Sequence, residues 1–330
     1  MFEAKIRAVG CYVPPRVLTN HDLEQMVDTN DQWIVERTGI RERHIAAPEM
    51  ATSDMALEAA QRALANAGLN PGDIDAIIVS TVTPDMFFPA TACLVQERLG
   101  AKGAWGFDLS AACSGFIYGL TTAAHLVKSG AHRRVLLIGA DTMSRILDYQ
   151  DRTTCVLFGD GAGAMIVERS EEPGDGGLID YIHEIDGSGG DMLKMPAGGS
   201  RKPATCATVT AREHYVHQQG GQVFKYAVGK LQSLCEQILE RNKIAVSDLS
   251  LLIPHQANRR IIAAVSERLG LRDDQVVINI DRYGNTTAAT IPLATNDALE
   301  SGRLQKGNVV LFAAVGAGYT AGVSLWRWSY

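Results

Sequence analysis

The sequence predicts a layered α/β fold built from two similar halves, because parts of the chain repeat in order. The hexapeptide at 95–100 (Val-Gln-Glu-Arg-Leu-Gly) recurs at 265–270 (Val-Ser-Glu-Arg-Leu-Gly), an offset of 170 in the numbering. Upstream of it, 73–80 resembles 248–255, an offset of 175. Repeats of this kind indicate a duplicated unit.

A third match lies downstream of the hexapeptide. Ser129-Gly130 precedes the apolar run 135–139, and Ser301-Gly302 precedes the apolar run 309–313; the two Ser-Gly pairs are related by an offset of 172. All three matches keep their order and nearly their spacing. We therefore expect two halves related by duplication.

Each half alternates helical periodicity with short apolar strands, which is typical of largely parallel sheets covered by helices. Two strands are also expected to close the first half, on either side of a glycine-rich turn. The expected helices are 55–67 and 223–241, and the expected strands are 76–81, 105–109, 135–139, 154–158, 164–168, 251–254, 276–280 and 309–313, with the turn at 159–163.

The length of 330 residues suits two units of about 150 residues each. We place them at 1–170 and 171–330. The segment from about 171 to 221 is rich in Gly, Ser, Asp and Pro, so it is expected to form long connecting loops with a few strands.

Composition excludes several classes of function. The net charge of −6 argues against nucleic acid as the main partner, because phosphate binding needs excess Lys and Arg. No run approaches the roughly 18 apolar residues of a membrane span, and 1–15 lacks a signal-peptide core, so a cytoplasmic protein is expected. The six cysteines show no metal-ligand spacing, and we expect no metal.

The repeat singles out three residues with catalytic side chains. Cys113 follows the expected strand 105–109, where a helix begins, and the offset of 172 pairs it with Asn285 in a similar turn. The offset of 175 pairs Ser80 with His255, at the end of the twin strand. A two-fold arrangement of the halves would bring these helix starts face to face.

The chemistry of these residue types suits a thioester. A thiol at a helix N-terminus feels the positive end of the helix dipole, which favours the thiolate. His255 through Nε2 and Asn285 through its amide could donate hydrogen bonds to a thioester carbonyl. The backbone amides of Cys113 and of Gly316-Ala317-Gly318 could form a second oxyanion hole, where glycine allows close approach.

Each of the three residues also has an ordinary structural interpretation. Taken alone, His255 is more often a hydrogen-bonded core histidine, Asn285 a helix cap, and Cys113 a small packing residue. Their convergence at duplicated positions favours the catalytic interpretation.

Five motifs, in order along the chain, resemble the thiolase-superfamily condensing enzymes, and specifically the β-ketoacyl-acyl carrier protein synthase III family. The motifs are 31–40 (Asp-Gln-Trp-Ile-Val-Glu-Arg-Thr-Gly-Ile), 108–116 (Asp-Leu-Ser-Ala-Ala-Cys-Ser-Gly-Phe), 158–164 (Phe-Gly-Asp-Gly-Ala-Gly-Ala), 253–258 (Ile-Pro-His-Gln-Ala-Asn) and 283–288 (Tyr-Gly-Asn-Thr-Thr-Ala). The resemblance covers essentially the whole chain. It implies a thiolase-like fold, with duplicated βαβαβ-type halves packed as an αβαβα sandwich.

The resemblance also implies a two-step reaction that starts fatty acid synthesis. Cys113 takes an acyl group from a short acyl-CoA, which is a substrate, so no cofactor is implied. Malonyl-acyl carrier protein then loses carbon dioxide, and His255 with Asn285 stabilises the enolate that attacks the acyl group.

Further roles follow from motif position within the family. Trp33 resembles the indole that stacks on the adenine of CoA, with Arg152 on its other face, and Arg37 resembles the partner of the CoA phosphates. Lys225 and Arg260 fall where the family presents basic groups to the acidic carrier protein.

The acyl pocket is assigned in the same way. Phe88 resembles the residue that crosses a homodimer interface to close the partner's pocket, and Met143 and Phe158 are expected to line it. The sequence departs from the family at Val315, commonly Phe, at Ala317, which is Gly in some relatives, and at Ala321, commonly aromatic. The missing bulk at Val315 is expected to change the acyl site.

Three other functions compete with this one. A hydrolase of the Cys-His-Asn type uses the same residue types. A related condensing enzyme of secondary metabolism, using a longer or unusual acyl-CoA, would fit the departures at Val315 and Ala321. A non-catalytic dinucleotide-binding protein is suggested by the glycines of 159–164, but these precede a strand rather than a helix.

Overall fold

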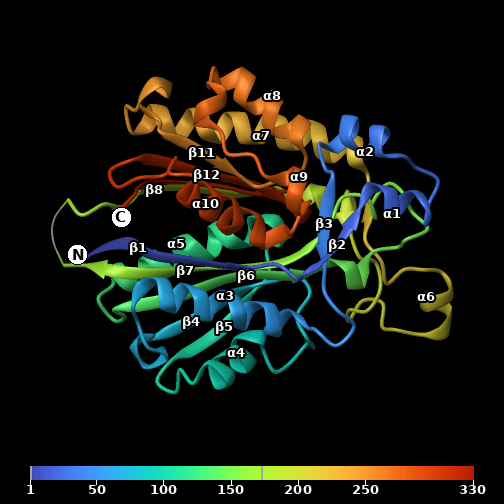
Figure 1. Cartoon of the computed structure of the whole chain (residues 1–330), viewed down its shortest axis with the longest axis horizontal. Helices are drawn as coiled ribbons and strands as arrows, with labels where there is room; N and C mark the ends of the chain where they lie inside the picture. The colour runs from blue at the N-terminus through green and yellow to red at the C-terminus, as the bar shows by residue number, and fades with distance from the viewer. Residues whose placement is uncertain (1, 172–173) are drawn as a thin grey trace.

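The structure is a computed structural model that describes residues 2–171 and 174–330. It consists of five layers in which helices and sheets alternate (Figure 1). Two sheets are separated by helices α5 (Gly115–Lys128) and α10 (Thr290–Glu300). Helices α3 (Thr52–Ala67) and α4 (Thr91–Leu99) cover the outer face of one sheet. Helices α7 (Gly220–Arg241) and α8 (Arg259–Leu269) cover the other, and the predicted αβαβα layering is confirmed.

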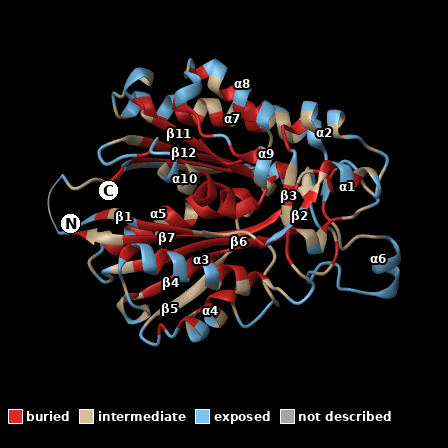
Figure 2. Cartoon of the chain, in the orientation of Figure 1, coloured by how far each residue is buried: buried red, intermediate tan, exposed pale blue. Residues whose placement is uncertain are grey.

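Burial follows this layering (Figure 2). The inner strands of both sheets and the two central helices are mostly buried, the edge strands β5 and β8 are partly exposed, and α3, α4, α7 and α8 each expose one face. The central position of α5 and α10 explains why their sequences are apolar nearly all round. Their first residues, Gly115 and Thr290, are both buried.

The first sheet has the strand order β1-β7-β6-β4-β5. Strands β4, β5 and β6 pair in parallel, β7 runs antiparallel to β6, and β1 runs antiparallel to β7. The strands are β1 (Glu3–Tyr12), β4 (Ala76–Ser80), β5 (Trp105–Leu109), β6 (Arg134–Thr142) and β7 (Asp160–Ser170).

The second sheet has the order β11-β12-β13-β8, which repeats the order of the first with β8 in the place of β1. The strands are β8 (Gly177–Ile185), β11 (Leu251–Pro254), β12 (Val309–Gly316) and β13 (Thr320–Arg327). The first sheet thus draws its strands from 3–170 and the second from 177–327. The division into units 1–170 and 171–330 stays a prediction.

Smaller elements form an extension beside the layers, at the right of Figure 1. They include the short pairs β2–β3 and β9–β10 and four short helices. Their bounds are β2 (Arg16–Thr19), β3 (Glu42–Ile45), β9 (Leu193–Lys194), β10 (His217–Gln218), α1 (Asn20–Glu24), α2 (Asp31–Thr38), α6 (Cys206–Thr210) and α9 (Ile280–Tyr283).

Strand register shows how the two halves correspond. Ala76 of β4 pairs with Val135 of β6, and Leu251 of β11 pairs with Val310 of β12. The step from 76 to 251 equals the step from 135 to 310, so the offset of 175 holds across β6 and β12, where the sequence match had indicated 172. The pairing of Ser80 with His255 follows the same offset.

Two predicted strands are wrong. Residues 154–157 form turns, because Cys155 and Leu157 make local backbone hydrogen bonds to Asp151 and Thr154, and Phe158 makes a single parallel bridge to Asn285. Most of the glycine-rich segment belongs to β7 instead. In the second half, 276–280 forms no strand; Val276 makes a single parallel bridge to Leu252. That bridge occupies the place that β5 has in the first sheet.

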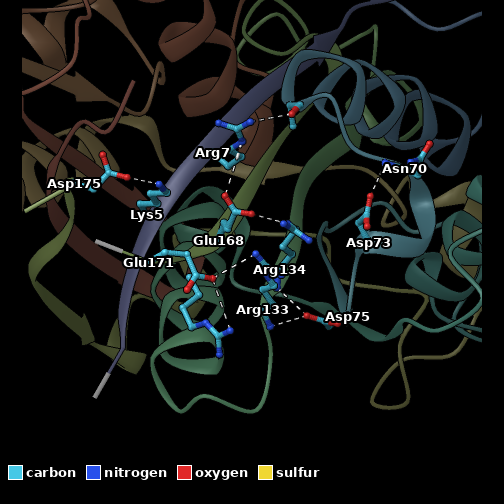
Figure 3. Close-up of polar contacts among 12 residues, drawn as sticks. Lys5, Arg7, Asn70, Asp73, Asp75, Arg133, Arg134, Glu168, Glu171 and Asp175 are labelled. Carbon is cyan, nitrogen blue, oxygen red and sulfur yellow. Dashed lines mark hydrogen bonds and ion pairs between the residues drawn. The ribbon is translucent and has the colours of Figure 1, made fainter. Parts of the chain in front are cut away.

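Ion pairs connect neighbouring strands at the surface of the first sheet (Figure 3). Glu168 of β7 lies directly opposite Arg134 of β6, and their charged atoms are 2.6 Å apart. Arg7 of β1 lies 3.8 Å from the same carboxylate. In the described part of the chain, no helix is long and apolar enough to cross a membrane.

Candidate active site

The turn that carries Cys113 is tightly built. The 3-10 turn η2 (Ala112–Ser114) connects β5 to α5, and Ala112 has a positive φ of 46°, a conformation that non-glycine residues adopt at a cost. A Cβ on Gly316 would lie 2.8 Å from the Cys113 amide nitrogen, so only glycine fits there. Gly316 therefore lies directly against the backbone of the Cys113 turn, and the expected oxyanion hole stays a prediction.

A matching turn in the second half carries Asn285. The 3-10 turn η7 (Thr287–Ala289) leads into α10, and Thr287 has a positive φ of 52°. The Asn285 Oδ1 accepts a hydrogen bond of 2.9 Å from the Thr287 amide. Because this bond requires an acceptor, it fixes the side-chain amide so that its NH2 group remains for another acceptor.

The two turns pack against each other, as the duplication predicted. The positive φ at Ala112 and at Thr287 marks equivalent positions, which are again related by the offset of 175. The structural counterpart of Cys113 is therefore Ala288, and the predicted pairing of Cys113 with Asn285 is wrong by three positions. Asn285 nevertheless lies in the same cavity as Cys113.

His255 directly follows β11 and is 5% exposed. Its backbone amide donates to the Ala313 carbonyl at 2.8 Å, and its Nδ1 lies 2.7 Å from the Thr290 Oγ1. Among the described residues its Nε2 has no hydrogen-bond partner. Burial lowers the pKa of His255 to about 3, so the imidazole is neutral near pH 7.

One cavity of about 420 Å³ brings most of the predicted site together. The three catalytic candidates line it with two predicted pocket residues, one predicted oxyanion-loop residue and three predicted ligand-contacting residues. These are Cys113, His255 and Asn285; Phe158 and Val315; Gly316; and Trp33, Arg37 and Arg260. The other candidates lie outside its described lining: Phe88, Met143, Arg152, Lys225, Ala317 and Gly318.

The expected stabilisation of a Cys113 thiolate is not found in this state. The side chain is 6% exposed, and burial, with the nearby Asp141 carboxylate, raises its pKa to about 12. The backbone amide lowers the pKa of Cys113, but by less than burial raises it. The thiol is therefore neutral at rest and needs a base at the moment of reaction.

Sequence reasoning missed Asp141, a buried carboxylate at the end of β6. It accepts hydrogen bonds from Val82 N at 2.8 Å, from Thr81 and Thr83, and from Ala288 N at 3.1 Å, which joins the first half to the second turn. Burial raises the pKa of Asp141 to about 6. An acidic residue ending an otherwise apolar strand was the available signal.

An aromatic and basic cluster lies at the mouth of the cavity. The guanidinium carbons of Arg152 and Arg37 lie 5.2 and 5.5 Å from the Trp33 ring centroid. Arg152 also donates to the Asp28 carbonyl at 2.8 Å. These contacts place both arginines beside the indole, and an adenine ring could stack on an indole so arranged.

A second basic group lies at the rim of the cavity, on helix α8. The Arg260 guanidinium carbon lies 5.4 Å from the Phe224 ring centroid, and both Arg260 and the nearby Lys225 are exposed. Positive charge at this rim suits an acidic partner.

The remaining pocket candidates divide into two groups. Phe158 and Met143 are buried in one hydrophobic cluster, but only Phe158 lines the described cavity. Phe87 and Phe88, by contrast, are 83% and 84% exposed and lie outside the described cavity lining. Large exposed aromatic side chains of this kind usually mark an interaction surface.

Comparison with known proteins agrees with this geometry. Residues 107–187 match the family described as 3-oxoacyl-[acyl-carrier-protein (ACP)] synthase III, and 239–328 match its C-terminal model. The β-ketoacyl-[acyl-carrier-protein] synthase III of Solibacter usitatus is 68% identical over the whole length of both chains. The chain belongs to this synthase III family.

Solved structures of related proteins share the fold. The 3-oxoacyl-[acyl-carrier-protein] synthase III of Aquifex aeolicus VF5 is 44% identical with a TM-score of 0.91, over 98% of this chain and 100% of that one. The priming β-ketosynthase of the R1128 polyketide pathway is 35% identical with a TM-score of 0.92, over 99% and 96%.

Membership of the synthase III family decides among the alternatives. The family consists of condensing enzymes, so the hydrolase and the non-catalytic dinucleotide-binding protein are not supported. Of the glycines in 159–164, Gly161 and Gly163 belong to β7 and pair with neighbouring strands, so this segment does not begin a helix.

Proposed function

We propose that this chain catalyses the condensation that initiates fatty acid synthesis, with Cys113 as the acyl carrier and a short acyl-CoA as the primer. The observation that supports this most is the cavity that holds a buried thiol, an unpartnered imidazole nitrogen and an oriented carboxamide, all among the described residues. Family membership gives the reaction class, an acyltransferase that joins an acyl group to a malonyl thioester.

The first half-reaction transfers the acyl group to Cys113. The sulfur attacks the thioester carbonyl, and the oxyanion is held by backbone amides at the Cys113 turn and at the Gly316–Gly318 loop. The second half-reaction uses malonyl-acyl carrier protein. Hydrogen bonds from Asn285 and His255 stabilise the enolate as carbon dioxide leaves, and its carbon attacks the acyl-Cys113.

The surroundings of the cavity suggest how the substrates bind. Trp33 with Arg37 and Arg152 would hold the adenine and phosphates of CoA, and Lys225 with Arg260 would hold the acidic carrier protein. Acyl-CoA is a substrate, and the reaction as proposed needs no cofactor. The setting we propose is the cytoplasm.

We also propose a homodimer in which Phe88 closes the partner's acyl pocket. The exposed Phe87 and Phe88 would be buried in that interface. Sedimentation of the wild type and of Phe88→Ala tests this. A monomeric wild type, or a Phe88→Ala dimer with unchanged primer preference, would contradict it.

A related function in secondary metabolism remains a second candidate. Val315 forms part of the cavity wall, where the family commonly has Phe, and the R1128 priming ketosynthase shares the fold at 35% identity. Kinetics with a panel of acyl-CoA primers separates the two. Preference for short primers supports fatty acid initiation, whereas preference for long or unusual primers supports the alternative.

Mass spectrometry tests the acyl-enzyme directly. After incubation with acetyl-CoA, the wild type should carry one acetyl group on Cys113, and Cys113→Ala should carry none. Cys235→Ala is a matched control, because Cys235 is also buried with its pKa raised to about 12, but it lies outside the cavity lining. An adduct on Cys235, or none with any acyl-CoA tested, would refute the proposal.

A further inference from the structure

The hydrogen bonds around His255 raise a question of proton placement. Nδ1 lies 2.7 Å from the Thr290 Oγ1, and the same hydroxyl lies 3.1 Å from the Thr287 carbonyl oxygen. A hydroxyl has one proton to donate. It can therefore donate either to the carbonyl or to Nδ1, but not to both.

Counting satisfied groups favours one arrangement. If Nδ1 carries the ring proton, it donates to Thr290, and Thr290 donates to the Thr287 carbonyl, so every group in the chain is paired. If Thr290 donates to Nδ1 instead, the carbonyl loses that bond and Nε2 becomes a buried N–H without a described partner. The resting ring is therefore the Nδ1–H tautomer, and Nε2 carries a lone pair.

The neutral state of both side chains indicates that a base is needed in the cavity, and the Nε2 lone pair is available for it. Burial keeps both the Cys113 thiol and the His255 imidazole neutral, so a preformed thiolate–imidazolium pair is disfavoured. The thiol must then lose its proton as the sulfur attacks, to a base within the same cavity. Nε2 of His255 has no partner among the described residues, and His255 lines that cavity.

We propose that Thr290 is a positioning residue for acylation: it holds His255 as the Nδ1–H tautomer, so that Nε2 accepts the Cys113 proton. The inference rests on the proposed function of the cavity. The bond between the Cys113 sulfur and the acyl carbon forms, the acyl–sulfur bond of CoA breaks, and Nε2 passes the proton to the departing CoA sulfur. His255 thereby returns to its starting tautomer.

The same hydroxyl also permits the condensation step, which needs a hydrogen-bond donor at Nε2. In the Nε2–H tautomer Nδ1 is an acceptor, and the Thr290 hydroxyl can donate to Nδ1 instead of to the Thr287 carbonyl. Water takes up the Nδ1 proton and supplies one to Nε2, with no net change. Thr290 thus biases the ring toward acylation without excluding condensation.

The first half of the chain supports the assignment by contrast. At the equivalent positions Ser80 replaces His255 and Gly115 replaces Thr290, and a Cβ on Gly115 would lie only 2.1 Å from the Ser80 Oγ. That pair has no ring and no room for a side chain at the helix start. The Thr290–His255 pair belongs to the second half alone.

Single-turnover kinetics of the two half-reactions test the proposal. Thr290→Val keeps the shape of the side chain but removes the hydroxyl, so an Nδ1–H would be enclosed by protein without an acceptor. An Nε2–H would face the cavity, where water or substrate can accept from it, and the ring should therefore become Nε2–H. Acetyl transfer from acetyl-CoA should fall about 100-fold, within the range for a lost general base. Condensation of the fully acetylated variant with malonyl-carrier protein should change by less than about threefold, because Nε2–H is the donor that step requires.

Two further variants separate positioning from folding. Thr290→Ser restores a hydroxyl and should recover most of the acetyl-transfer rate. Thr295→Val removes another buried hydroxyl of α10, one that donates to the Ile291 carbonyl, and should leave both half-reactions unchanged. Equal losses in both half-reactions of Thr290→Val, or no loss in either, would overturn the proposal.

Nitrogen-15 NMR of labelled histidine gives a readout independent of rate. The His255 signals, assigned by their absence in His255→Gln, should report Nδ1–H in the wild type and Nε2–H in Thr290→Val. A wild-type ring protonated at Nε2 would overturn the inference. If the wild type itself forms no acyl-Cys113, the proposed function fails. If the wild type does form it, but Thr290→Val changes the acetyl-transfer and condensation rates by the same factor, only the role of Thr290 fails.

Discussion

The two turns at the centre of the molecule have the same backbone and different chemistry. Each is a 3-10 turn with a non-glycine residue at positive φ, Ala112 in one and Thr287 in the other, and each leads into a buried central helix. The first turn presents a thiol. The second turn has an alanine, Ala288, at the equivalent position. Its polar side chains lie on either side of the turn, at Asn285 before it and at Thr290 after it.

The difference shows how a duplicated scaffold produces an asymmetric site. Strand register, turn geometry and helix starts stay equivalent at the offset of 175, whereas the side chains at the equivalent positions differ. The first half supplies the nucleophile and the second supplies hydrogen-bonding groups. The equivalent pairs are Ser80 and His255, Ser110 and Asn285, Cys113 and Ala288, and Gly115 and Thr290.

Removing the carboxamide of the second turn should have the largest effect. Asn285→Ala deletes an oriented donor, and decarboxylation should slow by about 10²–10³-fold, about 3–4 kcal/mol in the barrier. Acetylation of Cys113 should continue at a reduced rate. Ser110→Ala, at the equivalent exposed position of the first turn, is the control and should stay within about twofold of wild type. Normal condensation by Asn285→Ala would show that the second turn has no catalytic part.

Disrupting the contact that Asp141 makes between the two halves should have the second-largest effect. In Asp141→Asn, one oxygen can still accept from Val82, but the new NH2 group then faces the Ala288 amide, where two donors oppose each other. We expect the free energy of unfolding, measured in urea, to fall by about 3 kcal/mol. Exposed Asp248→Asn should change it little. Equal stability of both variants would mean that Asp141 does not join the two halves.

A glycine in β6 gives a steric test of the same contact. A Cβ on Gly139 would lie 2.4 Å from the Ala288 carbonyl oxygen, while the equivalent position in β12 is Ala314. Gly139→Ala should therefore push the second turn away and lower the free energy of unfolding by about 2 kcal/mol. Gly103→Ala, where a Cβ meets no atom within 4 Å, is the control. A fully stable Gly139→Ala would show that the turn can move without cost.

The sequence predicted the layers and the catalytic candidates because both leave local signals. Apolar strands and periodic helices repeat along the chain, and Cys113 stands in a motif with small neighbours. The displaced pairing with Asn285 arose because the offset of 172 came from the Ser-Gly pairs that follow α5 and α10. Helix α10 has 11 residues and α5 has 14, so the helix ends are shifted by three positions relative to the helix starts. The neutral thiol and the role of Asp141 depend on burial, and burial is a property of the assembled halves.

The pH dependence of stability tests whether His255 is as buried as its position implies. Its folded pKa, about 3, lies below the ordinary value of 6.5, so on acidification the unfolded chain takes up a proton first. The stabilising contribution is complete above pH 6.5 and is lost as the pH falls toward 3.

Between pH 7 and pH 5.5 the wild type should therefore lose about 1 kcal/mol more than His255→Gln does. Asp141 works in the opposite direction, because its raised pKa of about 6 makes the folded chain hold its proton longer, but it is present in both proteins and cancels in the difference. Identical pH profiles would place His255 in contact with water and remove the reason for a neutral imidazole at the centre of the site.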